Sequence, residues 1–204
     1  MTRIAVVDHG AGNLVSIAQG LRRAGAEVTV TDGPGGFDGC DGIVLPGVGT
    51  TGAAMQRLDA AGLSDPLRAW PGPLLGICVG LQLFFDSSDE DASHALGLIP
   101  GVVRELVDAP RLPHIGWNDV ALRSDPIFAG IDDGATFYFV HSYAPDPASD
   151  LVVIGTSTYG RPFAAAVRSG HRVGVQFHPE RSGVAGLRIL GNFVALCAEA
   201  SRAA

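Results

Sequence analysis

The sequence contains no lysine: all 14 of its basic residues are arginine. A chain without lysine has no Walker-type phosphate loop and no Schiff-base chemistry on a lysine amine. Acidic residues number 21, which gives a formal net charge of −7. This charge weighs against nucleic acid as a partner, because nucleic-acid-binding surfaces are basic.

Cysteine is scarce, and Cys40, Cys78 and Cys197 form neither a C-x-x-C pair nor a metal-ligand spacing. An odd number of cysteines suits a reducing compartment. The sequence therefore predicts no metal site and no cofactor. No apolar run approaches membrane-span length, and residues 1–7 lead straight into a strand without a signal peptide. We expect a cytoplasmic protein with no membrane partner.

The 204 residues, of which 47% are hydrophobic, suffice for one domain over residues 1–204 with a substantial core. In the first half, predicted strands over residues 3–7, 28–31, 42–45 and 73–77 alternate with predicted helices over residues 14–21, 51–58, 65–70 and 79–85. Asn13 is placed to cap the first helix. Alternating strands and helices predict an α/β fold with a mostly parallel central sheet and helices on both faces.

The second half reads differently, because its strands follow one another without long helices between them. We predict strands over residues 102–106, 118–122, 136–140, 151–157, 163–168 and 173–177, separated by turn signals such as Asp132-Asp133-Gly134. They indicate an antiparallel or mixed extension of the same domain. Residues 184–200 form a closing helix with one apolar face.

The most informative short motif is Gly76-x-Cys78-x-Gly80, at the junction of a buried strand and a helix. The same pattern with serine is the nucleophile elbow, a sharp turn that exposes one side chain above the sheet. Glycines on both sides remove Cβ atoms that would clash. A helix N-terminus favours a thiolate, so Cys78 is a candidate nucleophile. A buried structural cysteine is the alternative.

The second motif is Gln176-Phe177-His178-Pro179-Glu180, which also follows a predicted strand. A cysteine nucleophile needs a base, and the base needs a carboxylate to orient it. His178 and Glu180 supply both if the fold brings them to Cys78. A lone histidine at a strand end is equally often structural, but the two motifs together are far more specific than either.

With these motifs the chain resembles the class I glutamine amidotransferases, which share a flavodoxin-like fold. Within that family it resembles the glutaminase subunits of imidazole glycerol phosphate synthase, from histidine biosynthesis. The resemblance runs nearly end to end. Its most specific segments are Pro46-Gly47-Val48-Gly49 and Pro113-His114-Ile115-Gly116-Trp117-Asn118, and it also includes residues 8–14 and 137–143.

The resemblance implies that Cys78 attacks the side-chain amide of glutamine while His178, oriented by Glu180, carries the proton. It implies no cofactor and one protein partner, a (β/α)8 cyclase subunit that receives the ammonia and forms imidazole glycerol phosphate. The residues implied in the remaining roles are Val79, Gly47 and Val48 for the oxyanion hole, Gly80, Gln82, Glu90, His141, Ser142 and Tyr143 for glutamine, and Asn13, Trp117, Asn118 and Tyr138 for the partner.

Some of these assignments have competing explanations. Glu90 lies in the acidic run of residues 86–91, which composition alone predicts to be a solvated loop. Trp117 and Tyr138 are alternatively core aromatics. The whole chain is alternatively the glutaminase subunit of another synthase, such as that of vitamin B6 synthesis, or a non-catalytic module on the same fold.

The chain also departs from the family pattern at a few positions. His9 stands where tyrosine is usual, Thr50-Thr51 replace a small residue and phenylalanine, Val79 replaces leucine, and Arg181 replaces lysine. Arginine is planar and bulkier than lysine, so the last exchange matters wherever a point charge is needed. The threonine pair adjoins the predicted oxyanion segment.

Overall fold

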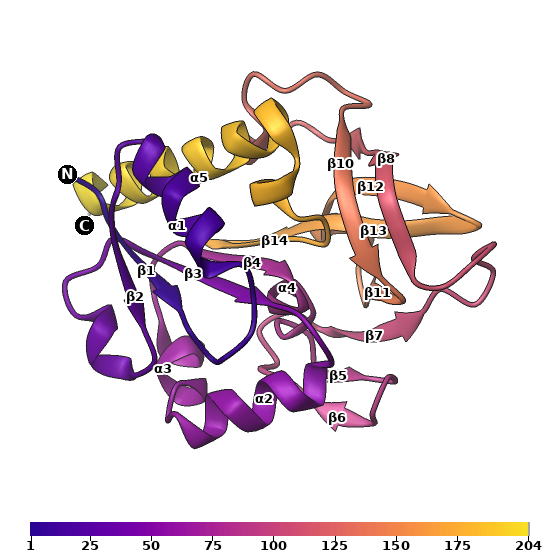
Figure 1. The fold of residues 1–204 in the computed structure, drawn as a ribbon, viewed down its shortest axis with the longest axis horizontal. Helices are drawn as coiled ribbons and strands as arrows, with labels where there is room; N and C mark the ends of the chain where they lie inside the picture. The colour runs from indigo at the N-terminus through magenta and orange to yellow at the C-terminus, as the bar shows by residue number, and fades with distance from the viewer. Residues whose placement is uncertain (204) are drawn as a thin grey trace.

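A computed structural model describes residues 1–203. Its main element is an eight-stranded sheet (Figure 1), and the order across it is β2-β1-β3-β4-β14-β13-β12-β9. The first five of these strands run parallel and the last three antiparallel. The strands are β1 (Arg3–Val7), β2 (Glu27–Thr31), β3 (Gly42–Gly47), β4 (Leu74–Cys78), β9 (Ala121–Leu122), β12 (Val153–Tyr159), β13 (Arg161–Ser169) and β14 (Arg172–Val175). This confirms the mostly parallel sheet with an antiparallel extension.

Helices cover both faces of the parallel part, as predicted (Figure 1). One face carries α1 (Leu14–Arg23) and α5 (Gly183–Ala203), and the opposite face carries α2 (Thr51–Ala60) and α3 (Ser64–Ala69). Every residue of β3 and β4 is buried between these layers. The apolar runs that the sequence shows at these strands are therefore explained by burial on both sheet faces.

Two smaller sheets stand beside the carboxyl end of the main sheet. One pairs β10 (Thr136–His141) with β8 (His114–Asp119), and the other has the order β11-β7-β5-β6. The strands of this second small sheet are β5 (Ser87–Ser88), β6 (Ser93–His94), β7 (Gly101–Glu105) and β11 (Tyr143–Pro147). Short 3-10 turns connect the larger elements: η1 (Pro34–Phe37), η2 (Pro126–Phe128), η3 (Asp150–Val152) and η4 (Pro179–Arg181).

Several predicted elements are wrong in detail. The predicted strand over residues 118–122 is divided between β8 and β9, which belong to different sheets. The predicted helix over residues 79–85 is the single turn α4 (Val79–Gln82), and β5, β6 and β11 were not predicted. Asn13 occupies the N-cap position of α1, but its side chain makes no capping hydrogen bond within residues 1–203.

The closing helix is longer than predicted, and this bears on membranes. An 18-residue window of the 21-residue helix α5 has a mean hydropathy of 1.3, so α5 is long and apolar enough, by length and composition alone, to cross a bilayer. Its apolar side is nevertheless part of the core, because Ile189, Leu190 and Phe193 are fully buried. Burial of this kind is typical of a core helix, and length and composition alone are weak evidence for a span.

Candidate active site

Cys78 ends β4 at the point where the chain turns into α4. Its backbone has φ 55° and ψ −112°, which is outside the regions that L-residues favour. Strained backbone of this kind clusters at functional sites, because the surrounding structure must hold it in place. Cys78 lies opposite Gly47 at the end of β3, so the nucleophile and the predicted oxyanion segment are neighbours at the carboxyl edge of the sheet.

The glycines of this turn are required by close packing. A Cβ atom on Gly76 would lie 2.6 Å from the Gly80 carbonyl oxygen, and one on Gly47 would lie 2.9 Å from the Val79 Cβ. A methyl group on Gly80 would overlap the Leu45 carbonyl oxygen. These contacts confirm the steric reason for the G-x-C-x-G pattern. Gly80 packs against the backbone of Leu45 and does not line the pocket beside Cys78, so we expect it to shape the site without touching substrate.

We expect Gly80→Ala to destabilise the fold, because backbone atoms of β3 cannot yield to the added methyl group. Overpacking typically costs about 1–3 kcal/mol, so the melting temperature should fall by roughly 5 °C. Gly33→Ala is the matched control, since nothing lies within 4 Å of its Cβ position and its φ of −148° suits alanine. Equal melting temperatures for the two variants would contradict this packing.

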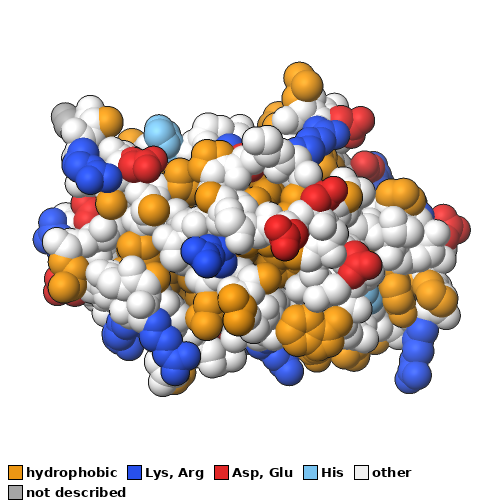
Figure 2. All heavy atoms as spheres, turned by 90° about the horizontal axis from the view of Figure 1, so that it is seen from above, with side chains coloured by type: hydrophobic (Ala, Val, Ile, Leu, Met, Phe, Trp, Pro, Cys, Tyr) orange, Lys and Arg blue, Asp and Glu red, His pale blue; other side chains and the backbone are white. Residues whose placement is uncertain are grey.

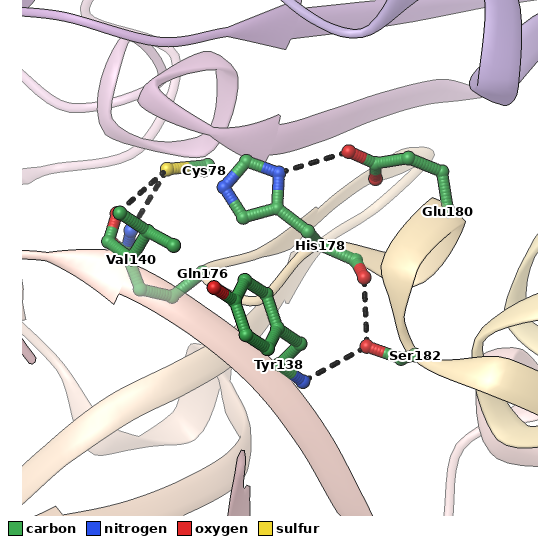
Figure 3. A network of polar contacts seen from close by, with 7 residues as sticks. All are labelled: Cys78, Tyr138, Val140, Gln176, His178, Glu180 and Ser182. Atoms are coloured by element: carbon green, nitrogen blue, oxygen red, sulfur yellow. Dashed lines mark hydrogen bonds and ion pairs between the residues drawn. The ribbon is translucent and has the colours of Figure 1, made fainter. Parts of the chain in front are cut away.

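His178 and Glu180 lie where the sequence predicts. His178 Nδ1 is 3.0 Å from Glu180 Oε1, and the Glu180 side chain is 1% exposed. This contact turns the other ring nitrogen toward Cys78, beside which the imidazole lies in Figure 3. Burial alone lowers the pKa of His178, but its interactions with Cys78 and Glu180 outweigh burial and raise that pKa to about 10. These interactions therefore favour the protonated, imidazolium form of the ring.

The backbone around His178 is clamped to β10. The Ser182 hydroxyl donates to the His178 carbonyl oxygen at 2.7 Å and accepts from the Tyr138 amide at 2.9 Å. The His178 amide in turn donates to the Tyr138 carbonyl oxygen at 2.9 Å. Figure 3 shows the two contacts of Ser182, which link the Tyr138 amide to the His178 carbonyl oxygen. The catalytic loop and β10 are therefore held in one fixed relation.

A pocket of about 190 Å³ opens beside Cys78. The predicted site residues that line it are Val48, Cys78, Val79, Gln82, Glu90, His141, Ser142, Tyr143 and His178. Gly49, from the predicted oxyanion segment, also lines it, and so do Val140 and Arg181, to which the sequence assigns no role in the site. The structure thus brings nearly all the predicted nucleophile, oxyanion and substrate residues to one cavity.

Glu90 faces the pocket in spite of its acidic neighbours in sequence. Burial raises the pKa of its carboxyl group, whereas a hydrogen bond from the Thr51 amide, at 3.4 Å, lowers it. The solvated-loop explanation therefore does not describe Glu90. A half-buried carboxylate in the wall is suited to hold the ammonium group of an amino-acid substrate.

The positions that depart from the family pattern have clear local roles. The Thr50 hydroxyl accepts from the Ala53 amide and caps α2, and the Thr51 hydroxyl donates to Gln82 Oε1 at 3.4 Å. His9 is buried, and its Nε2 donates to the Pro46 carbonyl oxygen at 2.7 Å. His9 and the threonine pair thus fix the two ends of the segment from Pro46 to Gly49. Gly49, with φ +90°, has the conformational freedom that this segment needs.

The predicted partner residues divide into two groups. Trp117 is 57% exposed and meets the ring of Tyr138 edge-on at 6.0 Å, and Arg181 lies over that ring at 4.3 Å. These aromatics therefore do not form part of the core, and Asn13 is also exposed. Asn118 differs, because its amide nitrogen already donates to the Thr158 carbonyl oxygen at 2.9 Å.

On the face seen in Figure 2, above α5 and α1, arginine and acidic side chains are interspersed with apolar ones. Within residues 1–203, no group of three or more histidine, cysteine, aspartate or glutamate side chains is arranged to hold a metal ion.

Residues 5–197 match the family model described as glutamine amidotransferase class-I. The chain is 46% identical to imidazole glycerol phosphate synthase subunit HisH of Moorella thermoacetica, over 100% of this chain and 99% of that protein. It is 44% identical to the subunit of the same name from Xanthomonas euvesicatoria pv. vesicatoria, over 95% of this chain and 98% of that protein. A putative GMP synthase subunit of Thermoplasma acidophilum shares the fold, with a TM-score of 0.75 at 23% identity over 100% of this chain and 97% of that one.

Proposed function

Because the chain belongs to the class I glutamine amidotransferase family, we propose that its pocket binds glutamine and releases the amide nitrogen as ammonia through Cys78. The chain is the glutaminase subunit of an imidazole glycerol phosphate synthase, an enzyme of histidine biosynthesis, as full-length identities of 46% and 44% to curated subunits support. A non-catalytic module or a glutaminase of vitamin B6 synthesis accounts for these observations less well. Its location in the cytoplasm stays a prediction.

One observation carries the assignment of the chemistry. Cys78 sits on a strained turn in a pocket wall, with the His178–Glu180 pair beside it. We propose that the Cys78 thiolate attacks the side-chain carbonyl carbon of glutamine. The negative charge then develops on the amide oxygen, where the Val79 N–H and an N–H of the segment from Gly47 to Gly49 stabilise it.

His178 then moves the protons. Its imidazolium donates one to the amide nitrogen, the C–N bond breaks, and ammonia leaves a thioester on Cys78. The neutral imidazole next takes a proton from water, which attacks the thioester. The C–S bond breaks, the electron pair returns to sulfur, and glutamate departs. Glu180 stabilises the charged ring in both steps, because its carboxylate faces Nδ1 at 3.0 Å.

We propose that a (β/α)8 cyclase subunit receives the ammonia. The names of the relatives describe subunits of a synthase, which implies a second subunit. The proposed docking surface comprises Asn13, Trp117, Asn118 and Tyr138. Trp117 supports it because it is exposed and because tryptophan is enriched at interface hot spots. Tyr138 connects this surface to His178 through the Ser182 clamp.

We expect the isolated chain to be a weak glutaminase that its liganded partner activates. The segment from Pro46 to Gly49 contains two glycines, so its peptide groups can reorient, and a missing oxyanion donor costs about 10²–10³ in rate. The measurement is glutamate production with and without the cyclase partner and its nucleotide substrate. High activity that does not depend on the partner would contradict this gating.

The docking surface is tested by the affinity of variant chains for the cyclase subunit. Trp117→Ala should weaken binding of the cyclase subunit by at least about tenfold, as truncation of an aromatic hot spot does. Leu151→Ala removes another exposed apolar side chain, 90% exposed on η3, and should leave the affinity unchanged. Equal affinities for the two variants would place the docking surface elsewhere.

A further inference from the structure

The Cys78 sulfur has two polar neighbours besides the His178 ring (Figure 3). The Val140 carbonyl oxygen, at 3.8 Å, accepts a hydrogen bond from the protonated thiol. Gln176 Nε2, at 3.6 Å, is an amide donor, so in this contact the sulfur is the acceptor. Accepting hydrogen bonds is the role of a thiolate. The two neighbours thus suit the two protonation states of Cys78.

The direction of the Gln176 amide follows from its own partners. The Tyr143 carbonyl oxygen accepts hydrogen bonds and donates none, so Gln82 must turn its NH₂ group toward it, at 2.9 Å. The same NH₂ group reaches Gln176 Oε1 at 3.1 Å. The carbonyl end of Gln176 therefore faces Gln82, and its NH₂ end faces the sulfur. This assignment is fixed by a backbone group and needs no assumption about amide flips.

Thr51 completes the arrangement from the far side. Its hydroxyl donates to Gln82 Oε1 at 3.4 Å, so both ends of the Gln82 amide are engaged. Thr51, Gln82 and Gln176 are all buried, and Gln176 is 0% exposed. A buried network with its polar atoms paired is rigid, because rotation of any member would leave an unpaired group in the interior.

A thiolate at Cys78 needs such a donor more than the sequence suggests. The helix that follows, α4, has only 4 residues, so its dipole is much smaller than that of a full helix. The stabilisation expected from a helix N-terminus must therefore come largely from other groups. Cys78 is only 3% exposed, so bulk water does not supply this stabilisation either.

We propose that Gln176 is a further catalytic residue, whose side-chain N–H holds the Cys78 sulfur as a thiolate on the side away from His178. The proposal rests on the proposed function, since it concerns the same nucleophile. Gln176 raises the thiolate fraction at neutral pH. It also favours the return of the electron pair to sulfur when the C–S bond of the thioester breaks. Gln82 and Thr51 are positioning residues for this donor.

The test is the pH dependence of Cys78 alkylation by iodoacetamide, followed by mass spectrometry of the Cys78 peptide. The titratable or charged groups around the sulfur are His178 with Glu180 behind it, and His141, Glu90, Tyr143 and Arg181 in the pocket. All of them remain in Gln176→Met. Hydrogen bonds to charged groups are strong enough that their loss shifts a pKa by about one unit.

In Gln176→Met we expect the pH midpoint of alkylation to rise by about one unit and the rate below it to fall about tenfold. Ser157→Ala is the control, because it also deletes a buried hydrogen bond, to the Asp119 carbonyl oxygen at 2.7 Å. Its profile should match that of the wild type. A folded Gln176→Met with an unshifted profile would overturn the proposal.

Two further measurements remove the dependence on one variant. The nearly isosteric Gln176→Glu places a carboxylate or carboxyl beside the sulfur, and its midpoint should rise by more than that of Gln176→Met. In the wild type labelled with ¹⁵N-glutamine, one side-chain amide signal should shift as Cys78 titrates or is alkylated. If no amide signal responds, the proposal fails. Alkylation requires neither glutamine nor the partner, so the glutaminase assay tests the proposed function separately.

Discussion

Replacing Cys78 by serine should abolish glutamine hydrolysis while the reconstituted complex still makes product from free ammonia. A serine hydroxyl in the same position has no comparable anionic form at neutral pH, so the thioester cannot form. The partner's step needs only the nitrogen, and it should therefore proceed when ammonia is supplied. The measurement is product formation from glutamine and from ammonium salts, with wild-type and variant chains in parallel.

A diazo-ketone analogue of glutamine checks the same claim directly, because it should attach one label to the chain, on Cys78. The other cysteines are poor competitors. Burial raises the pKa of Cys197 to about 12, and it also raises the pKa of Cys40. Both are therefore thiols at neutral pH. Label on Cys40 or Cys197, or glutamine turnover by Cys78→Ser, would exclude Cys78 as the nucleophile.

His178→Ala should slow glutamine hydrolysis by about 10²–10⁴, the usual contribution of a positioned acid–base group. Glu180→Gln should cost less. Glutamine can accept from His178 Nδ1 through its carbonyl oxygen, while its NH₂ group replaces Glu180 Oε2, which has no partner within residues 1–203. The variant loses the negative charge and keeps the orientation, so the kinetic loss measures the charge. Wild-type rates in either variant would refute these roles.

The pair of His178 and Glu180 also predicts that the free energy of unfolding depends on pH. The pKa of His178 in the folded chain, about 10, lies above its unfolded value near 6.5. His178 therefore contributes stability that is complete below about pH 6.5 and is lost as the pH rises toward 10. Glu180→Gln lowers this folded pKa and should flatten the loss. The comparison is the free energy of unfolding of wild type and variant between pH 6 and pH 10.

The elements that sequence predicts well are those that depend on local pattern. The buried runs of β1, β3 and β4 and the G-x-C-x-G turn carry their signals within a few residues. Their parallel arrangement follows from the helices between them. The carboxyl edge of such a sheet then brings Gly47 and Cys78 together without further information.

What the sequence does not predict depends on contacts between distant segments. The strands β5 and β6 have two residues each and exist because β5 pairs with β6 on one side and with β7 on the other. Glu90 lies in the turn between β5 and β6, so the pairing of these strands holds it at the pocket although its neighbours are acidic. The division of the predicted strand over residues 118–122 likewise reflects its two partners, β10 and β12.

Gln176 illustrates the limit most clearly. It stands in the Gln176-Phe177-His178-Pro179-Glu180 motif, so the sequence draws attention to its neighbourhood. Its role depends on Gln82 and Tyr143, which come from other parts of the chain. No spacing rule relates these positions, because the network is set by packing at the carboxyl edge of the sheet. A glutamine two residues before a catalytic histidine is the one available signal.

The most direct test of the central claim, that this chain delivers the glutamine nitrogen to a synthase, is isotopic. The reconstituted complex is given glutamine labelled with ¹⁵N in the amide and an excess of unlabelled ammonium at neutral pH. Ammonia that escaped to water would be protonated, since an amine titrates well above pH 7, and would mix with the unlabelled pool. We predict that ¹⁵N dominates in the imidazole product. A product that carries mainly unlabelled nitrogen would contradict the account.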